Sequence, residues 1–174
     1  HQLVKGFGMT SDMMIHSDMT TLERVAFSKV DCEKIAVVGL GYVGLPLCMA
    51  LARHHKSVTG FDISTRRVTA LLTGQDSTGE VESAALRSSS ARLTMNPADI
   101  AGATFYIVTV PTPIDAARRP DLNPLRSACE VIGPLLSPGN IVVFESTVYP
   151  GVTEDFCGPL LEQHSGLRAG KDFF

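Results

Sequence analysis

The chain has 174 residues, enough for one domain with a full hydrophobic core and too few for two ordinary ones. Its 44% hydrophobic and 19% charged residues are typical of a folded globular protein rather than a disordered one. The formal net charge of −3 gives no indication of a nucleic-acid partner, and no apolar run reaches the roughly 18 residues that a membrane-spanning helix needs.

The cysteines and the N-terminal sequence indicate the cellular compartment in which the protein acts. Four cysteines are scattered along the chain without a CxxC pair, and neither they nor the five histidines have the spacing of metal ligands. No signal peptide is recognisable at the start of the sequence. We therefore expect a reduced, cytoplasmic protein without a bound metal.

The first 30 residues differ from the rest, because they are polar, rich in methionine and aperiodic. We expect residues 1–30 to be a loose extension, or residues added during cloning, and residues 31–174 to form the folded domain. From Lys34 onward, apolar runs alternate with helical segments. The predicted strands are Lys34–Val38, Ser57–Phe61, Arg92–Met95, Thr104–Val110 and Ile141–Phe144.

Helices are predicted between these strands. The longer ones are Gly44–His54, Ser64–Thr73, Asn123–Leu136 and Gly151–Ser165, with a short one at Ser83–Arg87. Asn96-Pro97 and Asn123-Pro124 each combine a capping residue with a proline that suits the first helical turn. Strands that alternate with crossover helices predict an α/β fold of the Rossmann type, a doubly wound parallel sheet in three αβα layers.

The last residues, Asp172-Phe173-Phe174, have the pattern of a further strand beginning. We therefore expect the domain to continue beyond Phe174, and the chain to be a piece of a longer protein.

A glycine turn, Gly39-Leu40-Gly41-Tyr42-Val43-Gly44, lies between the first predicted strand and the first helix. Gly39 would permit the tight turn, Gly41 would let the backbone approach a pyrophosphate, and Gly44 would let the helix pack closely on the strand. The N-terminus of the helix would then direct unpaired N–H groups at the phosphates. This context favours a dinucleotide site over a turn that is only structural.

Asp62 follows the second predicted strand, where an acid can accept hydrogen bonds from an adenosine ribose. A carboxylate there would repel a 2′-phosphate, so NAD is favoured over NADP. Arg66 and Arg67 instead favour NADP, because sites of this kind also use arginine to bind the 2′-phosphate. Other roles stay open: contact with the adenine or the adenosine-side phosphate, and for Arg66 a solvated start of a helix.

Four motifs occur in a fixed order, GLGYVGLPL, GFD, TVPTPID and ESTVYPG. With them the chain resembles the UDP-glucose/GDP-mannose dehydrogenase family from about Lys34 to Phe174. Within that family, IVTVPTPID, PDLNPL and VVFESTVYPGVTED are most similar to the branch that oxidises UDP-N-acetylhexosamines for surface polysaccharides. The resemblance implies an NAD-binding domain of a nucleotide-sugar 6-dehydrogenase.

The resemblance also assigns roles to individual residues. Tyr42 and Val43 match positions whose backbone meets the pyrophosphate, and Asp62 matches the acid that binds the ribose. Arg67 matches the basic residue that accompanies this acid. Thr112, in TVPTPID, matches a threonine that contacts the cofactor near its middle. The alternative, that the prolines around it make only a rigid loop, stays open.

The motif EST supplies two further candidates. Thr147 matches a threonine near the nicotinamide whose hydroxyl positions a catalytic water. Glu145 could orient that threonine or its loop, and a role as catalytic base is a weaker alternative. Tyr149-Pro150-Gly151 is more typical of a turn into the next helix than of a site.

The reaction implied by the resemblance is a four-electron oxidation of a sugar C6 alcohol to a carboxylate, with two NAD reduced per sugar. The aldehyde formed first is held as a thiohemiacetal on a cysteine, and a thioester forms before water releases the product. None of Cys32, Cys48, Cys129 and Cys157 has the sequence context of that nucleophile. We therefore expect this chain alone to bind NAD but not to turn over a sugar nucleotide.

The resemblance further implies that most of the UDP-sugar site lies outside this chain, and that the full-length protein is a homodimer or larger. Three other functions remain open from the sequence. They are an NAD-dependent dehydrogenase of a related fold, such as a hydroxyacid or 6-phosphogluconate type, a stand-alone NAD-sensing module, and a methyltransferase that uses S-adenosylmethionine.

Overall fold

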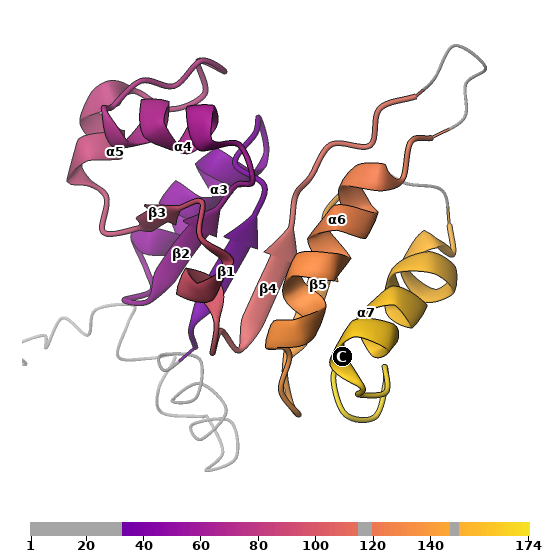
Figure 1. Cartoon of the computed structure of the whole chain (residues 1–174). Helices are drawn as coiled ribbons and strands as arrows, with labels where there is room; N and C mark the ends of the chain where they lie inside the picture. The colour runs from indigo at the N-terminus through magenta and orange to yellow at the C-terminus, as the bar shows by residue number, and fades with distance from the viewer. Residues whose placement is uncertain (1–32, 115–119, 147–149) are drawn as a thin grey trace, which may run out of the picture. The chain divides into compact units, whose positions relative to one another are not determined.

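Five parallel strands form the sheet, in the spatial order β3-β2-β1-β4-β5 (Figure 1). The structure is a computed structural model that describes residues 33–114, 120–146 and 150–174. The strands are β1 (Ile35–Val38), β2 (Val58–Phe61), β3 (Arg92–Thr94), β4 (Phe105–Val108) and β5 (Ile141–Phe144). In the register, Val38 pairs with both Phe61 and Val108, so the residues that follow β1, β2 and β4 meet at one edge of the sheet.

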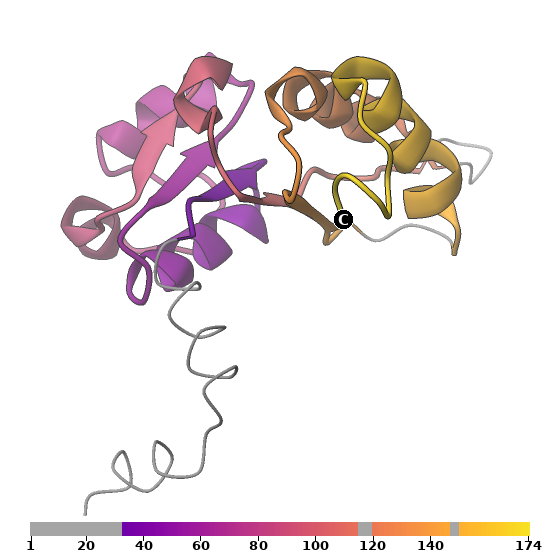
Figure 2. The ribbon, with the colours of Figure 1, turned by 90° about the horizontal axis from the view of Figure 1, so that it is seen from below.

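Helices cover both faces of this sheet. They are α3 (Gly44–Ala52), α4 (Thr65–Leu72), α5 (Ser83–Ser88), α6 (Asn123–Ile132) and α7 (Gly158–Ser165). Side chains of α3, α4 and α5 pack with one set of β1 residues, Ile35 and Val37. Side chains of α6 and α7, which lie side by side in Figure 2, pack with the alternate set, Ala36 and Val38. All four β1 residues are therefore buried, which confirms the predicted three-layer, doubly wound fold.

Of the two asparagines predicted to cap helices, one does so in the structure and the other does not. The Asn96 side chain accepts a hydrogen bond from the Ala98 N–H at 3.2 Å and caps a short 3-10 turn, Pro97–Ile100, as predicted. Asn123 is not a cap, contrary to the prediction, because it is the first residue of α6 itself. Asp121 accepts a hydrogen bond from the Asn123 N–H at 2.9 Å and satisfies that end of the helix instead.

The last two predicted helices are shorter than expected. α6 ends at Ile132 and is followed by the 3-10 turn Gly133–Leu135, because Pro134 has no N–H to continue an α-helix. The helix predicted from Gly151 begins later, since Gly151 has a φ of 94°. Thr153–Cys157 then forms a π-helical turn before α7 starts.

Phe174 pairs with β5 in the manner of a further parallel strand. Its N–H donates to the Asn140 carbonyl at 2.9 Å, and its carbonyl accepts from the Val142 N–H at 2.6 Å. No strand is assigned to the predicted start at Asp172–Phe174: Asp172 lies in a turn, and Phe173 forms an isolated bridge with Ala169, so these two hydrogen bonds are all that joins Phe174 to β5 within the described part of the chain. Among the described residues, no helix is both long enough and apolar enough to cross a membrane.

Candidate dinucleotide site

The glycine turn joins β1 to α3, and its three glycines meet different surroundings. Gly39 has a φ of 100°, a conformation that side chains rarely adopt, so it makes the tight turn. A Cβ on Gly44 would overlap the Gly39 carbonyl oxygen and Thr109 Oγ1, so this glycine lets α3 pack against the turn. A Cβ on Gly41 would meet nothing within 4 Å. The turn is thus closely packed at both ends and open in the middle.

Thr109, directly after β4, holds the turn from the neighbouring strand. Its hydroxyl donates to the Gly39 carbonyl at 2.7 Å, with a longer contact to the Val38 carbonyl at 3.2 Å. Thr109 is the first residue of the TVPTPID motif, but no role was predicted for it, because neither the motif nor the apolar run before it indicates this contact. This contact engages the Gly39 carbonyl and joins the glycine turn to the end of β4.

Asp62 follows β2 and bonds to the same turn. Its Oδ2 accepts from the Leu40 N–H at 2.8 Å, and its Oδ1 accepts from the Ser64 N–H at 2.8 Å. A carboxylate has about four acceptor sites, so both oxygens retain capacity for hydroxyl donors. This is the position and chemistry that the recognition of a ribose diol requires.

Arg67, in the first turns of α4, reaches back to the glycine turn. Its Nε donates to the Leu40 carbonyl at 2.8 Å, and its Nη1 forms an ion pair with Asp76 at 2.7 Å. The side chain is 11% exposed. Arg67 and Asp62 therefore bind the two ends of the same residue, Leu40. Arg66, its neighbour, is exposed.

Asp76, the ion-pair partner of Arg67, was not predicted to contribute to the site. Its side chain is 1% exposed and accepts hydrogen bonds from the N–H groups of Thr78, Glu80 and Val81 at 2.9–3.0 Å. Burial alone would raise the pKa of Asp76, but the bonds from Thr78, Arg67 and Val81 outweigh burial and hold the pKa well below its usual range. Asp76 is therefore an anion around which the 76–81 loop folds. The Asp76-Ser77-Thr78 sequence is a turn signal that could have indicated this loop.

A cavity of about 600 Å³ lies at this edge of the sheet, and most of its lining is apolar. Of the predicted cofactor-binding residues, Gly39, Gly41, Tyr42, Asp62 and Arg67 line it. The far wall comes from the 76–81 loop and from the start of α6, including Asn123 and Ser127. The cavity thus lies at the carboxyl ends of the strands, between β1 and β4, where the strand order reverses and open α/β sheets bind their ligands.

The structure does not bring every predicted residue to this cavity. Two predicted residues, Val43 and Gly44, do not line the cavity. Val43 is 57% exposed, and Gly44 is buried at the start of α3. Thr112 does not line the cavity either. Thr147 lies outside the described residues, so its predicted role stays a prediction. Nearby, the Ser146 hydroxyl donates to the Val110 carbonyl at 2.6 Å and ties the segments after β5 and β4 together.

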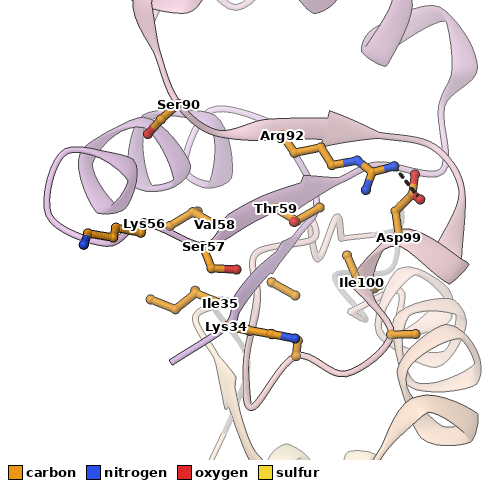
Figure 3. Close-up of a pocket in the computed structure, with 13 residues that line it drawn as sticks. Lys34, Ile35, Lys56, Ser57, Val58, Thr59, Ser90, Arg92, Asp99 and Ile100 are labelled. Atoms are coloured by element: carbon orange, nitrogen blue, oxygen red, sulfur yellow. Dashed lines mark hydrogen bonds and ion pairs between the residues drawn. The ribbon is translucent and has the colours of Figure 1, made fainter. Parts of the chain in front are cut away.

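A second cavity, of about 300 Å³, lies at the opposite edge of the sheet (Figure 3). It is lined by the amino ends of β1, β2 and β3, and it includes Lys34 and Lys56. Arg92 and Asp99 point toward each other there and form an ion pair at 2.6 Å. This pair is therefore well separated from the glycine turn.

The comparisons with known proteins identify this arrangement. The model of the NAD-binding domain of the UDP-glucose/GDP-mannose dehydrogenase family matches residues 33–173. The chain belongs to this family. The UDP-N-acetyl-D-glucosamine 6-dehydrogenase of Pseudomonas aeruginosa is 52% identical over 142 residues, which cover 81% of this chain and 33% of the relative. The protein CapL of Staphylococcus aureus is 51% identical, with 82% and 33% covered.

A solved structure agrees with these relatives. The UDP-D-ManNAc dehydrogenase of Pyrococcus horikoshii superposes with a TM-score of 0.73 at 33% identity, covering 80% of this chain and 34% of that one. The chain spans about a third of the length of the curated relatives it matches. What it contains is the NAD-binding domain of the family. The methyltransferase and the other dehydrogenase types left open by the sequence are therefore excluded.

The residues of the site fit NAD. The open space at Gly41 leaves room for a pyrophosphate to approach the backbone at the positive end of the α3 dipole. Further into α3, the N–H groups of Leu45 and Leu47 already donate to the Gly41 and Val43 carbonyls at 3.2 Å. Asp62 lies where it can bind the adenosine ribose. The largely apolar walls suit the faces of an adenine ring.

Proposed function

We propose that this chain provides the NAD-binding part of a UDP-N-acetylhexosamine 6-dehydrogenase that acts in the cytoplasm and supplies an oxidised sugar for surface polysaccharides. The observation that carries the proposal is the open backbone at Gly41 beside the Asp62 carboxylate, in a chain about half identical to a UDP-N-acetyl-D-glucosamine 6-dehydrogenase. The free, buried thiols of Cys48, Cys129 and Cys157 support a reducing compartment.

The residues of this chain bind and orient the cofactor. Asp62 accepts hydrogen bonds from the adenosine ribose, while the turn at Gly41 and the start of α3 hold the diphosphate. Thr147, in the segment that follows β5, would position a water near the nicotinamide, as the resemblance to the family implies. NAD, when bound, accepts a hydride in each oxidation step.

The overall reaction converts the C6 alcohol and one water to a carboxylate, and it transfers two hydrides to two NAD with release of three protons. The covalent steps need a thiol that a substrate can reach. Cys48, Cys129 and Cys157 are at most 1% exposed, and burial raises the pKa of Cys48 to about 12. Cys32 lies outside the described residues, and its sequence context is not that of the nucleophile. We therefore propose that the nucleophile and most of the UDP-sugar site belong to further parts of the full protein, and that this protein is a homodimer or larger.

The stoichiometry of the reaction tests this function. The complete protein that contains this chain is expected to form two NADH per UDP-N-acetylglucosamine consumed, because a four-electron oxidation needs two hydride acceptors. The 174-residue chain alone is expected to form none, although it binds NAD. One NADH per sugar, or turnover by the chain alone, would contradict the proposal. NAD binding without any turnover by the complete protein would favour the NAD-sensing alternative.

The Asp62→Ala substitution tests the cofactor site in the chain itself. It should raise the dissociation constant for NAD by about tenfold to a hundredfold, because a hydrogen bond to a charged group contributes about 1.5–3 kcal/mol. Isothermal titration of NAD into the chain measures this. Asp62→Asn, which keeps an oxygen for the Leu40 N–H, should have a smaller effect. Equal affinity of wild type and Asp62→Ala would show that this acid does not bind the ribose.

A further inference from the structure

Protein groups contact all three nitrogens of the Arg67 guanidinium and leave one of its five N–H donors, on Nη2, without a contact among the described residues. Nε donates to the Leu40 carbonyl at 2.8 Å, and Nη1 contacts both Asp76 at 2.7 Å and the Ser77 hydroxyl at 3.1 Å. Nη2 makes a longer contact of 3.5 Å with the Thr78 hydroxyl. The planar group is therefore held in one orientation, between the glycine turn and the 76–81 loop.

Asp76 is held as firmly as its partner. Three backbone N–H groups and the Thr78 hydroxyl donate to its two oxygens, at distances of 2.7–3.0 Å. Its side chain is 1% exposed and does not line the cavity, so a ligand meets Arg67, Ser77 and Thr78 and not Asp76. Any influence of Asp76 on the cofactor must therefore act through Arg67 or the loop.

This pair lies beside the position proposed for the adenosine ribose. Asp62 accepts from the Leu40 N–H while Arg67 donates to the Leu40 carbonyl, and both side chains line the cavity. A phosphate on the 2′-oxygen of that ribose would lie next to Asp62 and within the neighbourhood of Arg67. Arginine is the residue with which related sites accept such a phosphate.

Arg67 could bind a 2′-phosphate through both of its terminal nitrogens, Nη1 and Nη2, only by leaving Asp76. That movement would strand a carboxylate that is almost fully buried, and an uncompensated buried charge is strongly destabilising. The ion pair also offsets the positive charge of Arg67 at the point where the phosphate would need it. The pair thus removes an apparent NADP determinant from the site.

We infer that Asp76 is a specificity-determining residue, which favours NAD over NADP by keeping Arg67 paired and directed at the Leu40 carbonyl. It acts as a positioning residue, in addition to the direct repulsion that Asp62 exerts on a 2′-phosphate. The inference rests on the proposed function, because it requires the adenosine ribose to bind at Asp62.

The test compares the dissociation constants of NAD and NADP for the chain and for Asp76→Asn. Asparagine keeps the size of the side chain and an oxygen for the loop N–H groups, but it releases Arg67 from its ion pair. The preference for NAD over NADP should fall about tenfold, as expected when a charge-assisted bond to the phosphate becomes available. Asp99→Asn makes the same change in the Arg92–Asp99 pair at the opposite edge of the sheet and should leave the preference unchanged.

Two Arg67 variants make the outcome decisive. In the Asp76→Asn background, Arg67→Gln should abolish the gain in NADP binding; a gain that persists would overturn the inference. In the otherwise wild-type chain, Arg67→Gln should leave the ratio of the two constants unchanged, and this arm does not depend on Asp76→Asn folding. Because Arg67→Gln leaves the buried Asp76 without its ion pair, the melting temperature of this variant is measured first to show that it is folded. A selective loss of NADP affinity there would show that Arg67 already serves the phosphate and would also overturn the inference.

The same titrations separate the inference from the proposed function. A wild-type chain that binds neither dinucleotide would overturn both. A wild-type chain that binds NAD, together with an unchanged preference in a folded Asp76→Asn variant, would overturn only the role of Asp76.

Discussion

Replacing Gly41 with valine is expected to raise the dissociation constant for NAD about a hundredfold or more, which corresponds to about 2.7 kcal/mol. The reason is steric. A Cβ at this position meets no protein atom within 4 Å, so the added side chain would occupy the space through which the pyrophosphate must approach the backbone. Calorimetric titration of NAD measures the loss, and Gly41→Ala should give a smaller one because it fills less of the space.

The stability of the same variant provides the control. Gly41 is not among the glycines with a positive φ, and its surroundings are open, so valine should fit the unliganded protein without strain. The melting temperature without NAD should therefore stay close to that of the wild type. Unchanged NAD affinity, or lost affinity together with a large drop in melting temperature, would contradict the steric explanation.

The fold could be predicted from the sequence because its signals are local. Apolar, β-rich runs and the segments between them placed the strands to within one or two residues, and β5 was predicted with the bounds it has. The helix ends were less predictable. Asparagine and glycine are both common where helices begin or turns form, so Asn123 and Gly151 were predicted to start helices. In the structure, Asp121 accepts a hydrogen bond from the first N–H of α6. The positive φ of Gly151 makes the last helix begin later.

The site was predictable only in part, for the same reason. Gly39, Gly41 and Gly44 lie within six residues and carry a recognisable pattern, and Asp62 follows the next strand at a typical spacing. Thr109 and Gly39, in contrast, are 70 positions apart, so their contact exists only after the sheet has formed. The Arg67–Asp76 pair joins a helix to a polar loop without regular structure. Arg67 could be recognised as a cation, but its partner, which decides what the cation can do, could not.

Gly44→Ala is expected to have the opposite effects to Gly41→Val, because these two glycines serve different purposes. A Cβ at position 44 would overlap the Gly39 carbonyl oxygen and Thr109 Oγ1, and it would lie 2.9 Å from the Gly39 carbonyl carbon. Overpacking in a core usually destabilises by about 1–3 kcal/mol. Because backbone atoms cannot move aside as a side chain can, we expect a loss of about 3 kcal/mol, at the upper end of that range.

For a domain of this size, such a loss lowers the melting temperature by about 10 °C. Differential scanning calorimetry of the unliganded chain measures it, with Gly41→Ala as the matched control that adds the same methyl group three residues earlier in the same turn. Thr109→Val in the Gly44→Ala background should restore little stability, because the Gly39 carbonyl remains in the way. An unchanged melting temperature for Gly44→Ala would mean that α3 can move away from β1. The close packing of helix on strand would then not be what places the first N–H groups of α3 beside the open turn.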